Sequence, residues 1–273
     1  MDIFTLIFTQ PIANGLVAIY KLTGSNLGLA IILFTTILLL VTRPLTKPYI
    51  ESLKKMQDLA PEVAKLKKKH KGNNIKFIQA QTELYRKKGV NPSAGCLPYF
   101  LQIVILIAFF NFFIHVFSSN NNIKDNLNAL MYPPLVFSES DVVSTKFLHI
   151  DLSKPDYYKI EGIPFELPGI LLILAAIVQF VSSKMMMPLT ESFESVAKST
   201  KNETDDMQFA IQKSFVYIFP IMTLLAGLTL PAGLALYWIT FSIYQIVNQY
   251  FISGWGGLLP FVNKVRKLLN FRI

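Results

Sequence analysis

Four polar side chains interrupt an apolar stretch near the end of the chain. Trp238, Ser242, Gln245 and Gln249 are four, three and four residues apart, which places them on one face of a helix. Glutamine amides donate and accept hydrogen bonds without carrying charge, so such a face could bind peptide-like groups without selecting ions. The spacing therefore predicts a polar stripe suited to hydrogen bonding rather than to bond cleavage.

Similar polar groups occur in three other apolar segments. Thr36 lies in the first, Gln102 in the second and Gln179 in the third. A single residue of this kind usually hydrogen-bonds to a neighbouring helix and only holds the helices together. Contributed by four helices at similar depth, these groups predict a hydrated cavity that could hold polar segments of a substrate.

Arg43 directly follows the first apolar segment. A cation in this position usually reaches the lipid headgroups and fixes the orientation of its helix. Alternatively, the guanidinium points into the hydrated cavity and attracts acidic groups, because water there offsets the cost of placing a charge in the bilayer. The residue pattern leaves both interpretations open.

No motif for covalent catalysis occurs in the chain. There is no Gly-x-Ser-x-Gly, no His-Glu-x-x-His and no phosphate-binding Gly-x-x-x-x-Gly-Lys-Ser/Thr. The three histidines, His70, His115 and His149, fall in separate segments and cannot share a metal by local spacing. The single cysteine, Cys96, excludes an internal disulfide. We therefore expect no enzyme, no cofactor and no metal site.

Membrane helices are the elements that must position these residues. Of the 273 residues 52% are hydrophobic and 16% charged, and stretches of 21, 35, 17 and 50 residues contain no charge at all. A spanning helix needs about 20 mostly apolar residues, and the longest stretch breaks into two helices at Pro231-Ala232-Gly233. The predicted fold is an all-α integral membrane protein with five transmembrane helices, at about 26–42, 97–117, 167–183, 215–230 and 234–252.

The charge distribution predicts how these helices are oriented. Segment 43–88 has 13 basic and 4 acidic residues, whereas 124–166 has 4 basic and 7 acidic residues. Because short basic loops stay in the cytoplasm, the N-terminus is predicted outside and the C-terminus inside. The parts expected are an interfacial helix in the outer segment 1–24, a core 25–273, an outer loop 118–166 with little regular structure, a cytoplasmic loop 184–213 and a basic cytoplasmic tail 253–273.

The basic segment predicts a cytoplasmic two-helix hairpin at 49–88. Gly72-Asn73-Asn74 separates its arms, and Pro61 should kink or restart the first arm. A thin apolar seam at helical spacing is expected between the arms: Leu59, Val63, Leu66, Ile75 and Ile78.

Lysines crowd the tip of this hairpin. They are Lys65, Lys67, Lys68, Lys69 and Lys71. They could bind anionic lipid headgroups or the phosphates of RNA, or they are simply solvated. The same alternatives apply to the basic tail.

Five passages of the sequence resemble the YidC family of membrane protein insertases of bacterial plasma (inner) membranes. The resemblance covers nearly the whole chain and is carried by Pro44-Leu45-Thr46 with the run 56–61, by Gly89 to Pro98 followed by Gln102, by Phe147 to Asp156 followed by Leu167-Pro168, by Phe219 to Thr223, and by Pro231 to Trp238. The run from Gly89 to Pro98 is the most specific of the five.

The resemblance implies a chaperone-like insertase that takes nascent hydrophobic segments, alone or beside the Sec translocon, and passes them into the lipid bilayer. It also implies a hydrophilic groove open to cytoplasm and lipid, a possible ribosome contact through the basic hairpin and tail, and no need for an oligomer. The family's groove arginine falls at Leu39 in this chain. Arg43 follows one helical turn later on the same face, so it is the expected replacement.

Two other functions fit the residue pattern. A hydrated cavity among five helices is also what a small-solute transporter or channel requires. The absence of Asp and Glu from the predicted spans and the large basic hairpin argue against this alternative. A purely structural assembly factor would use the same surfaces as an insertase.

Overall fold

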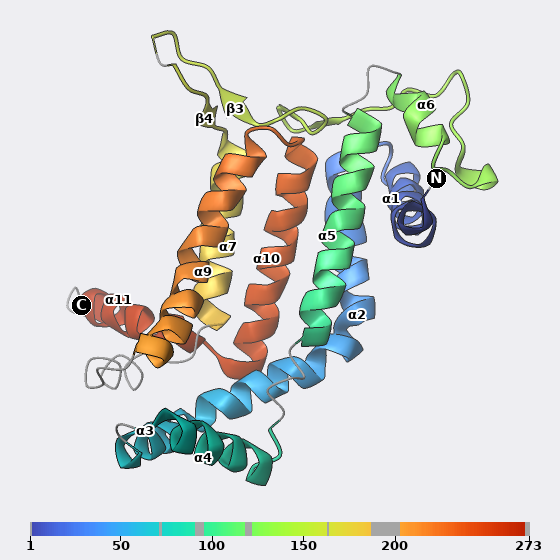
Figure 1. Ribbon diagram of the computed structural model, residues 1–273. Helices are drawn as coiled ribbons and strands as arrows, with labels where there is room; N and C mark the ends of the chain where they lie inside the picture. The colour runs from blue at the N-terminus through green and yellow to red at the C-terminus, as the bar shows by residue number, and fades with distance from the viewer. Residues whose placement is uncertain are drawn as a thin grey trace. The chain divides into compact units, whose positions relative to one another are not determined.

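Helices carry all the apolar segments in the part of the chain that the computed structural model describes, residues 2–70, 73–90, 96–117, 122–162, 164–186 and 203–270. The five long ones are α2 (Leu27–Asp58), α5 (Cys96–Phe117), α7 (Ile170–Met186), α9 (Glu203–Gly227) and α10 (Ala232–Ser253) (Figure 1). Each contains most of one predicted span, so the all-α prediction is confirmed.

Two of these helices are long and apolar enough to cross a membrane. They are Leu27–Pro48 within α2 and Phe100–Phe117 within α5, while Ile170–Met186 and Val216–Gly227 are apolar but shorter. The count of five spans therefore stays a prediction.

The described residues belong to two compact units. Unit 1 comprises Met1–Thr42, Tyr99–Gln179 and Pro220–Tyr244. Unit 2 comprises Arg43–Pro98, Phe180–Phe219 and Gln245–Ile273. All five long helices pass from one unit into the other.

The first long helix, α2, continues much further than its predicted span. It runs through Pro44 and Pro48 to Asp58, so the residues from 49 onward extend the helix instead of opening a separate arm. Each proline removes one backbone donor but leaves the other turns paired. The Thr46 hydroxyl also donates to the Arg43 carbonyl at 3.1 Å, next to the two prolines.

The predicted hairpin begins after Leu59. Its arms are α3 (Ala60–Lys69), with Pro61 in the first turn, and α4 (Asn74–Lys87), whose first turn is capped by the Asn73 side chain. The restart at Pro61 is confirmed. Leu59 and Val63 are buried as predicted, but the prediction for Ile75 and Ile78 was wrong, because both are exposed, and the buried apolar residue of that part of α4 is Phe77.

Unit 1 is built around an aromatic core. Phe109 and Phe113 of α5 and Tyr237 of α10 are almost fully buried, and the rings of Phe109 and Tyr237 stack with centroids 4.4 Å apart. The N-terminal helix α1 (Gln10–Leu22), which follows a π-helical turn at Thr5–Thr9, packs Leu16 and Val17 into the same core.

The outer loop has more regular structure than predicted. It contains α6 (Ile123–Asn128), a 3-10 turn (Pro133–Leu135) and the short antiparallel ladder of β1 (Lys146–Phe147) with β2 (Ile150–Asp151). Its last strand, β3 (Tyr157–Tyr158), pairs with β4 (Leu167–Pro168), so the first two residues of the predicted third span form a strand. Side chains supply hydrogen bonds that a polar loop otherwise takes from water. Asn128, for example, both donates to and accepts from the backbone of Phe137.

One stretch of this loop caps two helices of unit 1. The amides of Ala232 and Gly233, at the start of α10, donate to the carbonyls of Lys154 and Leu152 at 2.8 and 2.9 Å. The Asp156 carboxylate accepts from the Leu172 amide in the first turn of α7 at 3.0 Å. These contacts satisfy donors that helix ends otherwise leave unpaired.

In unit 2, the chain leaves α10 through a tight corner. Gly254 and Gly256 have φ angles of +67° and +47°, a conformation that suits glycine because it has no Cβ. A 3-10 turn (Gly256–Leu258) then leads into the last helix, α11 (Leu259–Asn270).

Candidate functional site

Gln102, one of the predicted polar groups, joins two helices of unit 1. Its Nε2 donates to the Tyr237 hydroxyl at 2.8 Å, which links α5 to α10. Gln102 itself is half-buried. Since a hydroxyl can donate or accept, this bond uses one half of the amide whichever way it is turned. The other half has no partner within the described residues.

Gln179 repeats this arrangement on another pair of helices. The Thr223 hydroxyl of α9 donates to the Gln179 Oε1 of α7 at 2.6 Å. Thr223 is buried, whereas Gln179 is half-buried. Its Nε2 likewise has no partner in the part of the chain that the structure describes. Both amides thus join two helices and leave one polar half without a partner among the described residues.

The remaining predicted residues of unit 1 offer fewer accessible polar groups to a ligand. The Thr36 hydroxyl donates at 2.7 Å to the Ile32 carbonyl of its own helix. Trp238 is partly buried against the hydrophobic core, and Ser242 is 3% exposed. No hydrogen bond joins any two of the five predicted residues in this unit, so the cavity they were expected to share stays a prediction.

Sequence reasoning missed two hydrogen bonds that tyrosines of α10 make to other helices. Tyr237 partners Gln102, and the Tyr244 hydroxyl donates at 3.2 Å to the Leu39 carbonyl, linking α10 to α2. The seven-residue separation of the tyrosines, two helical turns, was a usable signal. Leu39, where the resemblance puts an arginine in other members, is a buried residue of α2.

Arg43 and the other predicted cavity residues belong to unit 2. Arg43 is exposed and forms no ion pair with any described residue. Gln245 is half-buried. Gln249 is only 3% exposed, and its Nε2 has no hydrogen-bond partner among the residues the structure describes. A buried unpaired amide donor is costly, so Gln249 is, after Gln102 and Gln179, a third candidate for binding a polar ligand.

The lysines of the hairpin are available to a partner. Lys65, Lys68 and Lys69 of α3 are exposed and Lys67 is half-buried, while Lys71 lies outside the described residues. The arms are joined by an ion pair between Lys88 and Glu62 at 3.1 Å. None of the described lysines of the tip takes part in this ion pair.

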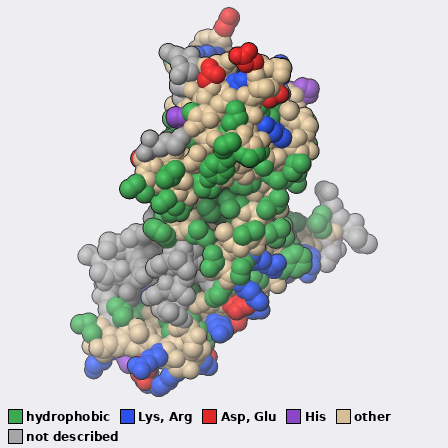
Figure 2. Space-filling model, turned by 90° about the vertical axis from the view of Figure 1, so that its right-hand side faces the viewer, with side chains coloured by type: hydrophobic (Ala, Val, Ile, Leu, Met, Phe, Trp, Pro, Cys, Tyr) green, Lys and Arg blue, Asp and Glu red, His purple; other side chains and the backbone are tan. Residues whose placement is uncertain are grey.

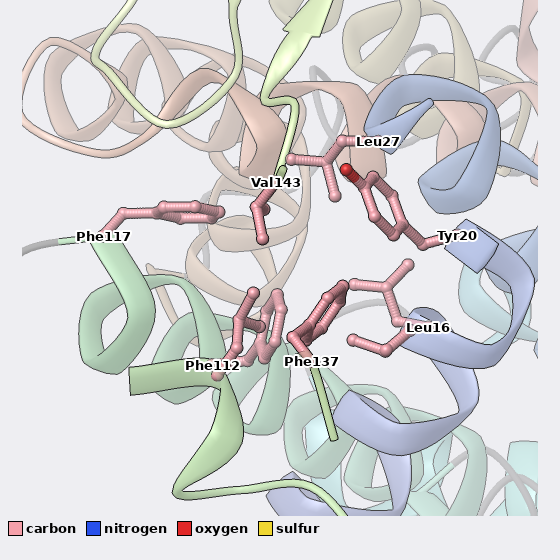
Figure 3. A pocket seen from close by; sticks show the side chains of 9 residues that line it. Leu16, Tyr20, Leu27, Phe112, Phe117, Phe137 and Val143 are labelled. Atoms are coloured by element: carbon pink, nitrogen blue, oxygen red, sulfur yellow. The ribbon is translucent and has the colours of Figure 1, made fainter. Parts of the chain in front are cut away.

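A small cavity in unit 1 is lined by apolar side chains. Figure 3 shows side chains of α1, α2, α5 and the outer loop, including Leu16, Phe112, Phe137 and Val143, pointing toward a common space. Its volume is about 20 Å³, little more than one water molecule occupies. The one polar group at its edge, the Tyr20 hydroxyl, already bonds the backbone of Ser144. This cavity is a packing gap of the core.

None of the described residues gather into a set of three His, Cys, Asp or Glu that could hold a metal. His115 is exposed on α5, His70 ends α3 and His149 lies in the outer loop.

Exposed hydrophobic side chains follow the outer faces of the long helices. On the face shown in Figure 2 such side chains gather over unit 1. They recur at helical spacing, as Leu29, Leu33, Ile37 and Leu40 on α2 and as Phe100, Ile103, Ile107 and Phe110 on α5. Soluble monomers rarely expose apolar surface in continuous stripes. Apolar stripes of this kind are typical of helical proteins that are embedded in lipid, and we place this protein in that class.

Comparison with known proteins identifies the family within that class. The 60Kd inner membrane protein family matches residues 18–256, and the chain belongs to this family. Membrane protein insertase YidC 2 of Bacillus anthracis is 31% identical over 90% of this chain and 80% of its own length. Membrane protein insertase MisCA of Bacillus subtilis is 32% identical over 89% of this chain and 77% of its own length. The family resemblance predicted from the five passages is confirmed.

Proposed function

We propose that this protein is a membrane protein insertase that accepts nascent hydrophobic segments and releases them into the bilayer. Family membership and the printed names of its relatives support the activity. The apolar stripes on α2 and α5 support a location within the membrane.

In this proposal α2, α5, α7, α9 and α10 each cross the bilayer. The N-terminus lies outside and the C-terminus in the cytoplasm, because segment 43–88 carries 13 of the 26 basic residues. The short apolar parts of α7 and α9 would then lie in a locally thinned bilayer.

The observation that carries the mechanism is the pair of half-used amides in unit 1. Gln102 and Gln179 are fixed by Tyr237 and Thr223, and each keeps one polar half for a substrate. A peptide entering the bilayer must lose its hydration, and a preorganised amide replaces part of it. The apolar segment then leaves into lipid, driven by about 25 cal/mol for each square ångström removed from water.

Unit 2 would contribute a cation and a buried amide to the same function. Because Leu39 is buried, Arg43 is the residue of α2 that we propose to attract acidic groups, about 6 Å further along the helix. The unpaired Gln249 Nε2 would donate to a carbonyl of the substrate. This mechanism requires no covalent step.

The further partners follow from exposed charge. We assign ribosome contact to the exposed lysines of α3, since RNA phosphates bind such clusters. Cooperation with the Sec translocon is the remaining proposal, and it rests on the family alone.

Insertion of a small membrane protein into liposomes tests the role of the amides. Gln102→Leu should slow insertion of a substrate with a polar translocated tail, because the substrate loses a hydrogen-bond partner. Tyr237→Phe is the matched control, because it breaks the same interhelical bond but keeps the amide. If the amide serves the substrate, Gln102→Leu is the slower variant. Equal losses in both would show that the bond only holds α5 to α10. Solute flux without added polypeptide would instead favour a transporter.

A further inference from the structure

The last helix, α11, separates apolar from basic side chains. Phe261, Val265, Leu268 and Leu269 occupy one side, and the exposed fractions of Phe261, Leu268 and Leu269 are 64%, 63% and 61%. Asn263 and Lys267 lie on the other side, with Lys264 and Arg266 at the two boundaries between the sides. No acidic residue occurs anywhere in 253–273.

A rigid corner sets the direction of α11 within unit 2. A Cβ on Gly256 would collide with the Met185 carbonyl oxygen, and Met185 is fully buried. Trp255 packs edge-on against Tyr250 near the end of α10, with ring centroids 5.1 Å apart. From this corner α11 runs across the direction of the end of α10 (Figure 1).

We propose that α11 lies in the cytoplasmic surface of the bilayer, with its apolar side among the acyl chains and its basic side on anionic phospholipid headgroups. This rests on the proposed membrane location, in which α10 ends at that surface. Tryptophan and tyrosine prefer this depth, and a basic amphipathic helix lies in the interface plane.

Charge and exposure together favour lipid over nucleic acid. RNA phosphates would pair with Lys264, Arg266 and Lys267 but would leave Phe261, Leu268 and Leu269 in water. An anionic bilayer surface takes up both sides of the helix at once.

Site-specific fluorescence on the full chain tests this placement. In a Cys96→Ser background, single cysteines are introduced at Val265 and Asn263, on opposite sides of α11, and labelled with an environment-sensitive dye. The protein is reconstituted in phosphatidylcholine vesicles with and without phosphatidylglycerol. A third label at Leu33→Cys, on the exposed apolar face of α2, reports whether the chain has integrated at all.

Acrylamide should quench the label at position 265 several-fold less than the label at 263, and lipid-attached quenchers should show the reverse order. Phosphatidylglycerol should increase the protection at 265, and a Lys264→Gln, Arg266→Gln, Lys267→Gln variant should lose that increase. Equal acrylamide quenching at both positions, with Leu33 protected, would overturn the proposal. Protection of 263 by added ribosomal RNA, with 265 still in water, would assign the helix to RNA.

Discussion

Arg43 is the residue on which the electrostatic half of the proposed insertion mechanism depends. It is exposed at the boundary where α2 leaves unit 1. In liposomes, Arg43→Ala and Arg43→Glu should slow insertion of a substrate with an acidic outer tail about fivefold, the equivalent of about 1 kcal/mol for a partly solvated charge contact. A basic tail on the substrate should restore the rate of the Glu variant.

Lys47 provides the matched control for Arg43. It is an exposed cation one turn further along α2 and pairs with Glu51 at 3.7 Å. Lys47→Glu should leave insertion unchanged. If Arg43→Glu also inserts acidic tails at the normal rate, Arg43 only anchors the orientation of α2, and the amides must carry the function.

Gly233 marks a close approach of the outer loop and of α5 to the start of α10. A Cβ there would meet the Phe113 ring and lie 3.3 Å from the Leu152 carbonyl oxygen. Gly233→Ala should therefore destabilise the protein by about 1–3 kcal/mol through overpacking, seen as a lower Tm in detergent. In a double-mutant cycle Phe113→Leu should recover part of that loss, and strictly additive effects would show that the ring is not the obstacle.

Single residues also show what sequence could and could not predict. Gln102 and Gln179 stand out because an amide in an apolar run must find a partner. Their partners Tyr237 and Thr223 could not be inferred, because the pairing depends on how the helices pack. Ile75 and Ile78 have the right spacing for the hairpin seam, but both are exposed and Phe77 is buried, since periodicity alone does not fix which side of a short helix faces its neighbour.

At the scale of elements, the β1–β2 ladder of the outer loop depends on one carboxylate. Burial raises the pKa of Asp151, but hydrogen bonds from Ser153 and Thr145 outweigh it and hold the pKa below the ordinary value of 3.8. The hydroxyls of these residues donate to Oδ1 at 2.6 and 2.7 Å. The ionised carboxylate is therefore the form that the folded loop prefers.

A lowered folded pKa fixes the direction of the pH effect. The stabilisation is complete above about pH 4 and is lost as the pH falls through the lowered pKa of the folded loop. The backbone amide of Ser153 donates to the same oxygen at 3.1 Å. As the pH falls through this range, that amide should exchange its hydrogen faster than the intrinsic pH dependence of exchange predicts. Asp151→Asn should remove the pH dependence, and an unchanged profile in that variant would contradict this origin.

The same loop shows why elements were only partly predictable. Its Pro and Asn residues correctly predict interruptions of regular structure. The two ladders, however, each contain only two residues per strand, too few to leave a periodic pattern. The β1–β2 ladder has side-chain support, because the Asp151 carboxylate accepts from Thr145 and Ser153 on either side of it.

For the whole molecule, the predicted orientation can be measured directly. In a Cys96→Ser background, a cysteine at exposed His149 should react with an impermeant maleimide added to intact cells from outside. A cysteine at exposed Lys68 should react only after the membrane is opened. The reverse pattern would invert the topology, and labelling of both positions in intact cells would rule out a fixed orientation.

At this scale the sequence predicted the architecture well, because long apolar runs such as 97–117 form helices whatever surrounds them. The end of the first span was harder to place. Pro44 and Pro48 look like a stop signal, yet α2 passes through both, since neighbouring turns keep their hydrogen bonds.

This continuity of α2 has a mechanical consequence. Its 32 residues amount to about 48 Å of helix measured along the axis, and the single residue Leu59, rather than a flexible linker, separates α2 from α3. A force applied to α3 is therefore passed to the last turns of α2, within the same unit, rather than being absorbed by a loose connection. Pro44 and Pro48 each lack the amide donor of a helical turn, so that stretch is the least stiff part of α2.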